Sequence, residues 1–136
     1  MDREAFVEEI LDHYQHPHNK RALPDADIHM EGGNPGCGDT VTLFLKTAPN
    51  GNVDQVTFLG QGCTISQAGT SMLTDMVKGK SLEEVQEMDF EDFINYMGRE
   101  VVISRVRCAT LGLGTLKAAA DTILKQRRQE ASDRAS

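Results

Sequence analysis

The sequence predicts an α+β fold in which an antiparallel β-hairpin near the middle of the chain lies between helical segments. Apolar and polar residues alternate through TVTLFLKT (40–47) and VDQVTFLG (53–60), which is the period of a β-strand. The dipeptide Asn50-Gly51 between them is a strong hairpin-turn signal. Before and after the hairpin, apolar residues recur every three or four positions, as they do in helices. The length of 136 residues corresponds to one domain, residues 1–136.

The chain before the hairpin is expected to form a helix, a loop and a short strand. A helix is predicted over residues 3–14, where one apolar stripe is formed by Phe6, Val7, Ile10, Leu11 and Tyr14. Pro17 ends this helix, and the chain is expected to be loop as far as Pro24. Residues 27–31 are interpreted as a short strand, and residues 32–40 (GGNPGCGDT) as a glycine-rich loop.

The hairpin strands have distinguishable faces. In the first strand, one face carries Val41, Leu43 and Leu45. In the second, the two faces carry Val53, Gln55, Thr57 and Leu59 on one side and Asp54, Val56 and Phe58 on the other. The alternation therefore supports two paired strands rather than a buried helix.

After the hairpin the chain is expected to be helical. Segment 64–79 carries an apolar stripe of Ile65, Ala68, Met72, Leu73, Met76 and Val77. Ser81 and Glu84 fit the S-x-x-E capping box that opens a short helix, and Gly98 is expected to close another over residues 89–98. The last helix is predicted over residues 108–128, with a frayed polar tail over residues 127–136.

Composition and charge exclude several classes of protein. The net charge of −7 argues against a nucleic-acid-binding protein, which needs clustered Lys and Arg. The first 98 residues hold 6 Lys and Arg against 17 Asp and Glu, whereas the last 38 hold 8 against 4, so a basic interaction face or a solvated basic helix is expected there. No apolar run approaches the length of a membrane span, and the acidic N-terminus does not resemble a signal peptide. A cytoplasmic protein is expected.

The three cysteines are the most informative residues of the sequence. An odd number cannot form a complete set of internal disulfides, and thiols are expected to be reduced in this setting. Cys37 lies in the glycine-rich loop, Cys63 where the second hairpin strand meets a helix, and Cys108 where a basic segment meets the last helix. None lies on a predicted core stripe, and Cys63 and Cys108 are expected at helix N-termini, where backbone amides stabilise a thiolate. Three unrelated buried thiols are the alternative.

Asp39 is a candidate fourth ligand. In Cys37-x-Asp39 the two side chains share the parity of a strand and can point to one side. Three thiolates and one carboxylate suit zinc or an iron–sulfur cluster, although an Asp after a Gly is by itself more often a turn residue. A second candidate metal group, His13, His16 and His18 with Asp12, is interpreted instead as a solvated helix end.

Four sequence blocks, in order, resemble the U-type iron–sulfur cluster assembly scaffold family, which comprises IscU, SufU and the N-terminal domain of NifU. The blocks are GNPGCGD, FLGQGCTISQAGTSML, MVKGKSLEE and RVRCATL, and the resemblance spans residues 4–126. It also includes LDHYQHPHNKRAL near the N-terminus, with Pro17 and Asn19. The resemblance implies an α+β sandwich with a small three-stranded antiparallel sheet and helices packed on one face. It implies that Cys37, Asp39, Cys63 and Cys108 converge at one end.

The chain departs from the IscU pattern near its last cysteine. Arg107 stands where IscU-type members carry a His, and REVVISRVR (99–107) replaces their LPPVK chaperone-binding stretch, so Hsp70-type chaperone docking is not carried over. RVRCATL is closer to the SufU type. Only 44 residues separate Cys63 from Cys108, however, and this lacks the SufU insertion.

The resemblance implies a scaffold that is not an enzyme. A cysteine desulfurase would deliver sulfur, with Cys108 as the sulfur acceptor, and iron would complete a transient [2Fe–2S] cluster on Cys37, Asp39, Cys63 and Cys108. Ferredoxin and an iron donor are further expected partners, and acceptor apo-proteins would receive the cluster. The protein would be a monomer or a cluster-bridged homodimer.

The basic residues near the last cysteine have expected roles of their own. Arg99, Arg105 and Arg107 are expected to contact the desulfurase, and Arg105 and Arg107 are expected to lower the pKa of Cys108. Asp39, a harder ligand than thiolate, would be the labile ligand at which the cluster is released.

Two other functions use the same four ligands. The first is a SufU-type sulfur acceptor that holds Zn²⁺ and relays persulfide sulfur without building a cluster. The second is a structural zinc domain, which is disfavoured because no Cys₄ or Cys₃His set is present.

Overall fold

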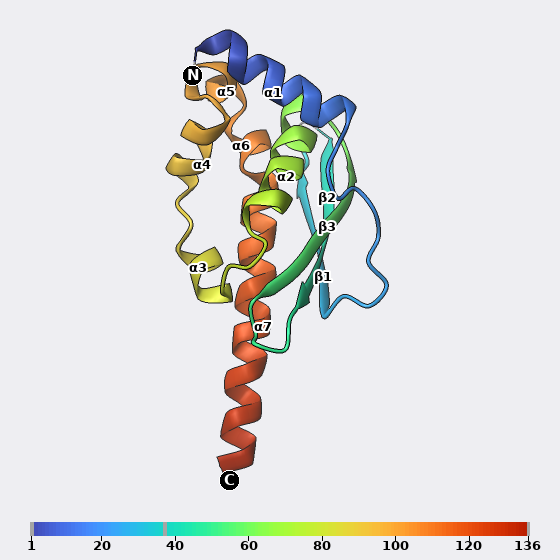
Figure 1. Ribbon diagram of the computed structural model, residues 1–136, viewed down its shortest axis with the longest axis vertical. Coiled ribbons are helices and arrows are strands. Elements are labelled where there is room, and N and C mark those ends of the chain that lie inside the picture. The colour runs from blue at the N-terminus through green and yellow to red at the C-terminus, as the bar shows by residue number, and fades with distance from the viewer. Residues whose placement is uncertain (1, 37, 136) are drawn as a thin grey trace.

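A three-stranded antiparallel sheet and helices against one of its faces make up the fold. The structure is a computed structural model, and it describes residues 2–36 and 38–135 (Figure 1). The strands are β1 (Ile28–Asn34), β2 (Asp39–Thr47) and β3 (Val53–Gln61), in the spatial order β1-β2-β3. Helices α2 (Thr64–Met76) and α7 (Leu111–Ala135) pack against the sheet, so the predicted α+β fold is confirmed.

The central strand carries the predicted alternation. Val41, Leu43 and Leu45 are at most 1% exposed and face the helices. In the register of β2 with β3, Leu43 pairs with Phe58, which is also fully buried, whereas its neighbour Leu59 is 44% exposed on the other face. The burial of these alternating side chains stabilises the sheet by removing apolar surface from water.

The glycine-rich loop is shorter than predicted, because β1 extends through two of its glycines to Asn34. A Cβ at Gly32 would lie 2.0 Å from Thr115 Oγ1 of α7, so glycine is required for the close approach of this helix to β1. The expected strand at residues 27–31 is therefore present but longer, and Asp39 and Thr40 already belong to β2.

Helix α1 (Arg3–Gln15) lies across one end of the molecule and packs on α2 (Figure 1). Its predicted stripe is only partly correct, since Ile10 is buried whereas Leu11 and Tyr14 are more than 40% exposed. A helix that lies across the end of the core buries a narrower strip of its side chains than a helix that lies along a sheet.

Short helices connect α2 to α7. Their bounds are α3 (Leu82–Glu87), α4 (Phe90–Met97), α5 (Arg99–Val102), the 3₁₀ helix η1 (Ile103–Arg105) and α6 (Val106–Ala109). The predicted capping box of Ser81 and Glu84 opens α3, and Gly98, with φ of +101°, ends α4.

The last helix differs from its prediction at both ends. It begins at Leu111, so Cys108 lies in α6 and not at the N-terminus of α7. It continues to Ala135, although residues 127–136 were expected to fray, and its last turns contain the i,i+4 contacts Lys125–Asp121 and Gln129–Asp133. Within the part of the chain that the structure describes, no helix has the length and apolar character needed to cross a membrane.

Candidate metal centre

Three candidate ligands from different elements meet at one end of the sheet. Asp39 is the first residue of β2, Cys63 precedes the first turn of α2, and Cys108 lies in α6. One ligand atom from each lies within 4.8 Å of the other two. The structure thus brings together three of the four predicted ligands, and the fourth, Cys37, lies outside the described residues.

Asp39 is the centre of the group. Its side chain is buried, with 1% exposure, and Oδ1 accepts hydrogen bonds from the Cys63 amide at 2.7 Å and from Ser66 Oγ at 3.2 Å. Oδ2 accepts one from Cys108 Sγ at 2.9 Å. Burial acts to raise the pKa of this carboxyl, but the hydrogen bonds from Cys108, Cys63 and Ser66 outweigh it and hold the pKa below its usual value. The carboxyl is therefore an anion at neutral pH.

Cys63 occupies the predicted position at a helix N-terminus. It is the N-cap of α2, and its Sγ accepts a hydrogen bond from the Ser66 amide at 3.4 Å. Cap geometry of this kind directs otherwise unpaired backbone N–H groups at the sulfur. The side chain is only partly buried, so this sulfur is the more accessible of the two described cysteine sulfurs.

Cys108 has a different environment from the one predicted. It is 2% exposed and therefore belongs to the interior, contrary to the expectation that no cysteine would. Burial, followed by the neighbouring Asp39 and Cys63, raises the pKa of this thiol to about 12. The prediction that Arg105 and Arg107 lower this pKa is wrong, because desolvation and two acidic neighbours outweigh them. In this state Cys108 is a protonated thiol that donates a hydrogen bond to Asp39.

This donor set fits a soft or borderline cation. Two sulfurs and one carboxylate oxygen lie within 4.8 Å of one another, and a cation placed among them would replace the thiol proton between Cys108 and Asp39. The ligands are drawn from a strand, a long helix and a short helix, so a bound metal or cluster would connect three elements of the fold.

Two residues that support the site, Asn34 and Ser66, have no signal in the sequence, whereas the glycine before Cys63 does. Asn34 Nδ2 lies 3.6 Å from Cys108 Sγ, and Ser66 hydrogen-bonds to Asp39. Gly62 has φ of +144°, and a Cβ there would lie 2.2 Å from Asp39 Oδ1. The glycine preceding Cys63 was a visible signal, but its steric reason depends on Asp39, which is 23 positions earlier in the chain.

Basic side chains border the site on the side of α6. A surface hollow beside Cys108 is lined by Asn34, Ile103, Arg105 and Arg107, among others, and a second hollow joins Cys63 to Arg105. Arg99 lies elsewhere, since it pairs with Glu91 and donates to Asn95 on α4. Of the three arginines expected to contact a desulfurase, Arg105 and Arg107 therefore lie beside the cysteines.

The histidine group is rearranged relative to the sequence hypothesis. His13 and His18 come together, but their acidic neighbour is Asp75 of α2, in place of Asp12, and His16 is not part of the cluster. Burial and the proximity of His18 lower the pKa of His13.

Comparison with known proteins places the chain in a family. The sequence model of the NifU-like N-terminal domain matches residues 5–130, which is nearly the whole chain. The chain belongs to this family.

Individual relatives carry names that agree with this assignment. The chain is 36% identical over 127 residues to "Iron-sulfur cluster assembly scaffold protein IscU" of Aquifex aeolicus, with 92% of this chain and 80% of the relative covered. It is 31% identical to the IscU of Escherichia coli K12, with 85% and 91% covered.

Solved structures share the fold. The SufU scaffold protein of Fervidobacterium islandicum superposes with a TM-score of 0.71 at 27% identity, with 88% of this chain and 99% of that chain covered. The N-terminal NifU-like protein of Brucella abortus gives a TM-score of 0.72 at 18% identity, covering 87% and 93%, and this likeness concerns the fold alone.

Proposed function

We propose that this protein is a scaffold on which an iron–sulfur cluster is assembled and from which it is passed to acceptor proteins. The observation that carries the proposal is the convergence of Asp39, Cys63 and Cys108, whose ligand atoms lie within 4.8 Å of one another. The names of the relatives support the same function. We propose Cys37 as the fourth ligand, because the sequence places it two residues before Asp39.

The cargo of the scaffold is a [2Fe–2S] cluster held by Cys37, Asp39, Cys63 and Cys108. Thiolates bind iron–sulfur clusters tightly, whereas a carboxylate is a harder and weaker ligand. A scaffold must release what it builds, and one oxygen ligand among three sulfurs gives the incoming acceptor a point of exchange. The chain itself turns over no substrate, so its role is assembly and not catalysis.

Cys108 is the proposed sulfur acceptor. In the transfer its thiolate attacks the outer sulfur of the desulfurase persulfide, the S–S bond breaks, and the desulfurase cysteine leaves as a thiolate. The buried thiol of Cys108 is unreactive as it stands, because its proton is held against Asp39. Movement of the segment from α5 to α6 would break this contact and expose the sulfur in the hollow that Arg105 and Arg107 line.

The partners follow from this reaction. A cysteine desulfurase supplies sulfur and acceptor apo-proteins receive the cluster, while an iron donor and ferredoxin supply iron and electrons. We propose that Arg105 and Arg107 lie in the desulfurase interface, because they border the hollow beside Cys108. The protein acts as a monomer or as a homodimer bridged by the cluster.

A second candidate function is a zinc-bound sulfur acceptor of the SufU type. Two features favour it: Arg107 precedes the last cysteine, and a SufU protein is a structural neighbour. Three thiolates and one carboxylate would bind Zn²⁺ tetrahedrally. In this function the same residues relay sulfur without holding iron.

Anaerobic reconstitution tests the scaffold against the zinc protein. The protein is incubated with Fe²⁺, cysteine, a cysteine desulfurase and a thiol reductant that converts persulfide sulfur to sulfide, and visible absorption is recorded together with iron, sulfide and zinc content. A scaffold acquires a chromophore with equal iron and sulfide, and Cys63→Ser loses it. Asp54→Ala, an acidic change elsewhere on the sheet, is the control. A colourless protein that retains one zinc per chain and accepts sulfur would contradict the scaffold and support the second function.

A further inference from the structure

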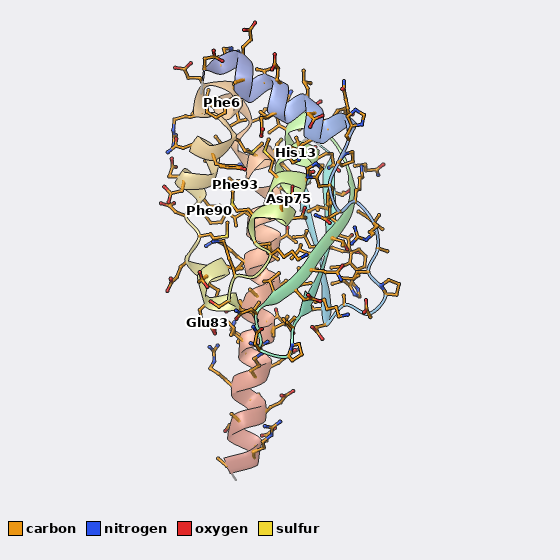
Figure 2. All side chains as sticks on the ribbon, viewed as in Figure 1. Phe6, His13, Asp75, Glu83, Phe90 and Phe93 are labelled. Atoms are coloured by element: carbon orange, nitrogen blue, oxygen red, sulfur yellow. The ribbon has the colours of Figure 1, made fainter. Side chains whose placement is uncertain are left out.

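A second cluster of ligating side chains lies away from the cysteines, where α1 packs on α2. It consists of His13 near the end of α1, His18 in the loop that follows, and Asp75 in the last turn of α2. Figure 2 labels His13 and Asp75 in this region. One ligand atom from each residue lies within 4.8 Å of the other two, and the imidazole centroids are 4.4 Å apart.

The three side chains are held in place by neighbours. Ser71 Oγ lies 2.8 Å from His13 Nδ1 and accepts a hydrogen bond of 2.8 Å from the main-chain N–H of His18. Asn19 Nδ2 donates to Asp75 Oδ1 at 3.2 Å. Contacts of this kind orient metal-binding imidazoles and carboxylates in known sites. Because Nδ1 of His13 faces Ser71, its Nε2 is the nitrogen left to bind a ligand.

The cluster is open to solvent at two of its three members, with His13 the most buried of the three, and it is separate from the cysteine site. The side chains of His18 and Asp75 are 46% and 48% exposed, so an ion can reach them without opening the fold. Asp75 follows Cys63 by 12 residues along α2, which corresponds to about 18 Å of helix. A single ion cannot contact both groups.

We propose that His13, His18 and Asp75 form a second metal-binding site, which takes a divalent transition-metal ion through two imidazole nitrogens and one carboxylate oxygen. This donor set suits Zn²⁺, Co²⁺ or Fe²⁺ and leaves at least one coordination position for water. At bond lengths of about 2.1 Å, tetrahedral ligand atoms lie about 3.4 Å apart, so small side-chain rotations complete the site. The proposal does not depend on the function of the cysteine site.

Cobalt binding distinguishes the two sites in the full-length protein. Co²⁺ on cysteine sulfur gives intense near-ultraviolet charge-transfer absorption, whereas Co²⁺ on imidazole and carboxylate gives only weak visible bands. We expect wild type to bind a second equivalent of Co²⁺ that adds visible bands without further charge-transfer absorption. His18→Gln and Asp75→Asn should each lose at least 90% of this second equivalent and keep the first.

His16→Gln is the matched control, because His16 lies in the same segment but not in the cluster. This variant should keep both equivalents. The proposal is overturned if wild type binds no second equivalent, if His18→Gln and Asp75→Asn still bind it, or if His16→Gln loses it.

A measurement on unmodified protein guards against variants that fold poorly. The chain has four histidines, His13, His16, His18 and His29, whose ring signals can be followed by NMR during a Zn²⁺ titration. The signals of His13 and His18 should shift together, and those of His16 and His29 should stay in place. Shifts confined to His16 or His29, or no shift of any histidine, would contradict the site.

Discussion

Asp39 connects the strand β2 to the helices α2 and α6, which together form the cysteine site. Its buried carboxylate accepts hydrogen bonds from the Cys63 amide, the Ser66 hydroxyl and the Cys108 thiol. A residue proposed as the weak ligand of a cluster is thus also a structural residue of the metal-free protein. Substitution of Asp39 should therefore affect both stability and cluster release.

Asp39→Ala should destabilise the metal-free protein by about 1–3 kcal/mol, because it leaves buried donors without an acceptor. Once a cluster is assembled, the same variant should hold it longer and pass it more slowly to an acceptor, since the exchangeable oxygen ligand is gone. Denaturant unfolding, and absorbance decay with and without an acceptor, measure the two effects. Asp27→Ala, which removes hydrogen bonds to Thr47 at the far end of β2, is the control and should leave cluster transfer unchanged. Faster cluster decay in Asp39→Ala would contradict the proposal that Asp39 is the labile ligand.

The pKa of Cys108 predicts how the stability of the metal-free protein depends on pH. The thiol has a pKa of about 12 in the folded protein, well above the value of about 8.5 in an unfolded chain. The folded state therefore retains the proton longer, so the free energy of unfolding should fall as pH rises from about 9 toward 12. Urea unfolding of reduced, metal-free protein at a series of pH values measures this, and Cys108→Ser should have a flatter profile. A metal ion that replaces the proton of the Cys108 thiol should also remove the dependence of stability on pH.

At the scale of elements, α2, which carries Cys63 at its N-terminus, packs closely against α7. A Cβ at Gly112 would lie 2.6 Å from Thr70 Oγ1 of α2, whereas one at Gly114 would meet, among the residues that the structure describes, nothing nearer than Phe90 at 3.9 Å. Gly112→Ala should therefore destabilise the protein by about 1–3 kcal/mol.

Gly114→Ala is the matched control for this contact, because the two glycines share a helix and differ in what they face. The control should stabilise by up to about 1 kcal/mol, since alanine is the better helix former. Thermal unfolding of both variants checks the pair. Equal effects would mean that helix propensity, and not the α2–α7 contact, governs this position.

The sequence predicted the elements whose residues carry a local signal. The alternation of Val41, Leu43 and Leu45 and the capping box of Ser81 and Glu84 depend only on near neighbours, and both were confirmed. The break between α6 and α7 has no such signal. It accompanies tertiary contacts, namely the burial of Cys108 against Asp39 and the approach of Gly112 to Thr70.

The candidate site also contains features that the sequence could predict and features that it could not. The position of Cys63 at a helix N-terminus could be predicted from the adjoining strand and helix patterns. The roles of Asn34 and Ser66 could not, because each depends on a side chain from a distant part of the chain. The raised pKa of Cys108 could not be predicted either, because the neighbouring arginines are visible in the sequence and burial is not.

The distribution of charge over the whole molecule bears on association with the desulfurase. The first 98 residues are acidic, and six of the eight basic residues of the last 38 lie in two places. Arg105 and Arg107 lie beside the cysteine site, and the other four, Lys125, Arg127, Arg128 and Arg134, lie along the C-terminal part of α7. Figure 1 shows that α7 extends away from the rest of the fold, so its C-terminal arginines are far from α6. The two basic regions can therefore be tested separately.

Reversal of Arg105 and Arg107 to Glu should slow association with the desulfurase and weaken its dependence on salt. Long-range attraction between charged surfaces raises the association rate and is screened at high ionic strength. The matched control is the double reversal of Arg128 and Arg134, which changes the net charge by the same amount on the exposed end of α7. Stopped-flow association at low and high salt should separate the variants by at least about tenfold at low salt and bring them together at high salt. If both double variants slow association equally, net charge and not the cysteine end governs the encounter. If neither does, the two arginines lie outside the interface.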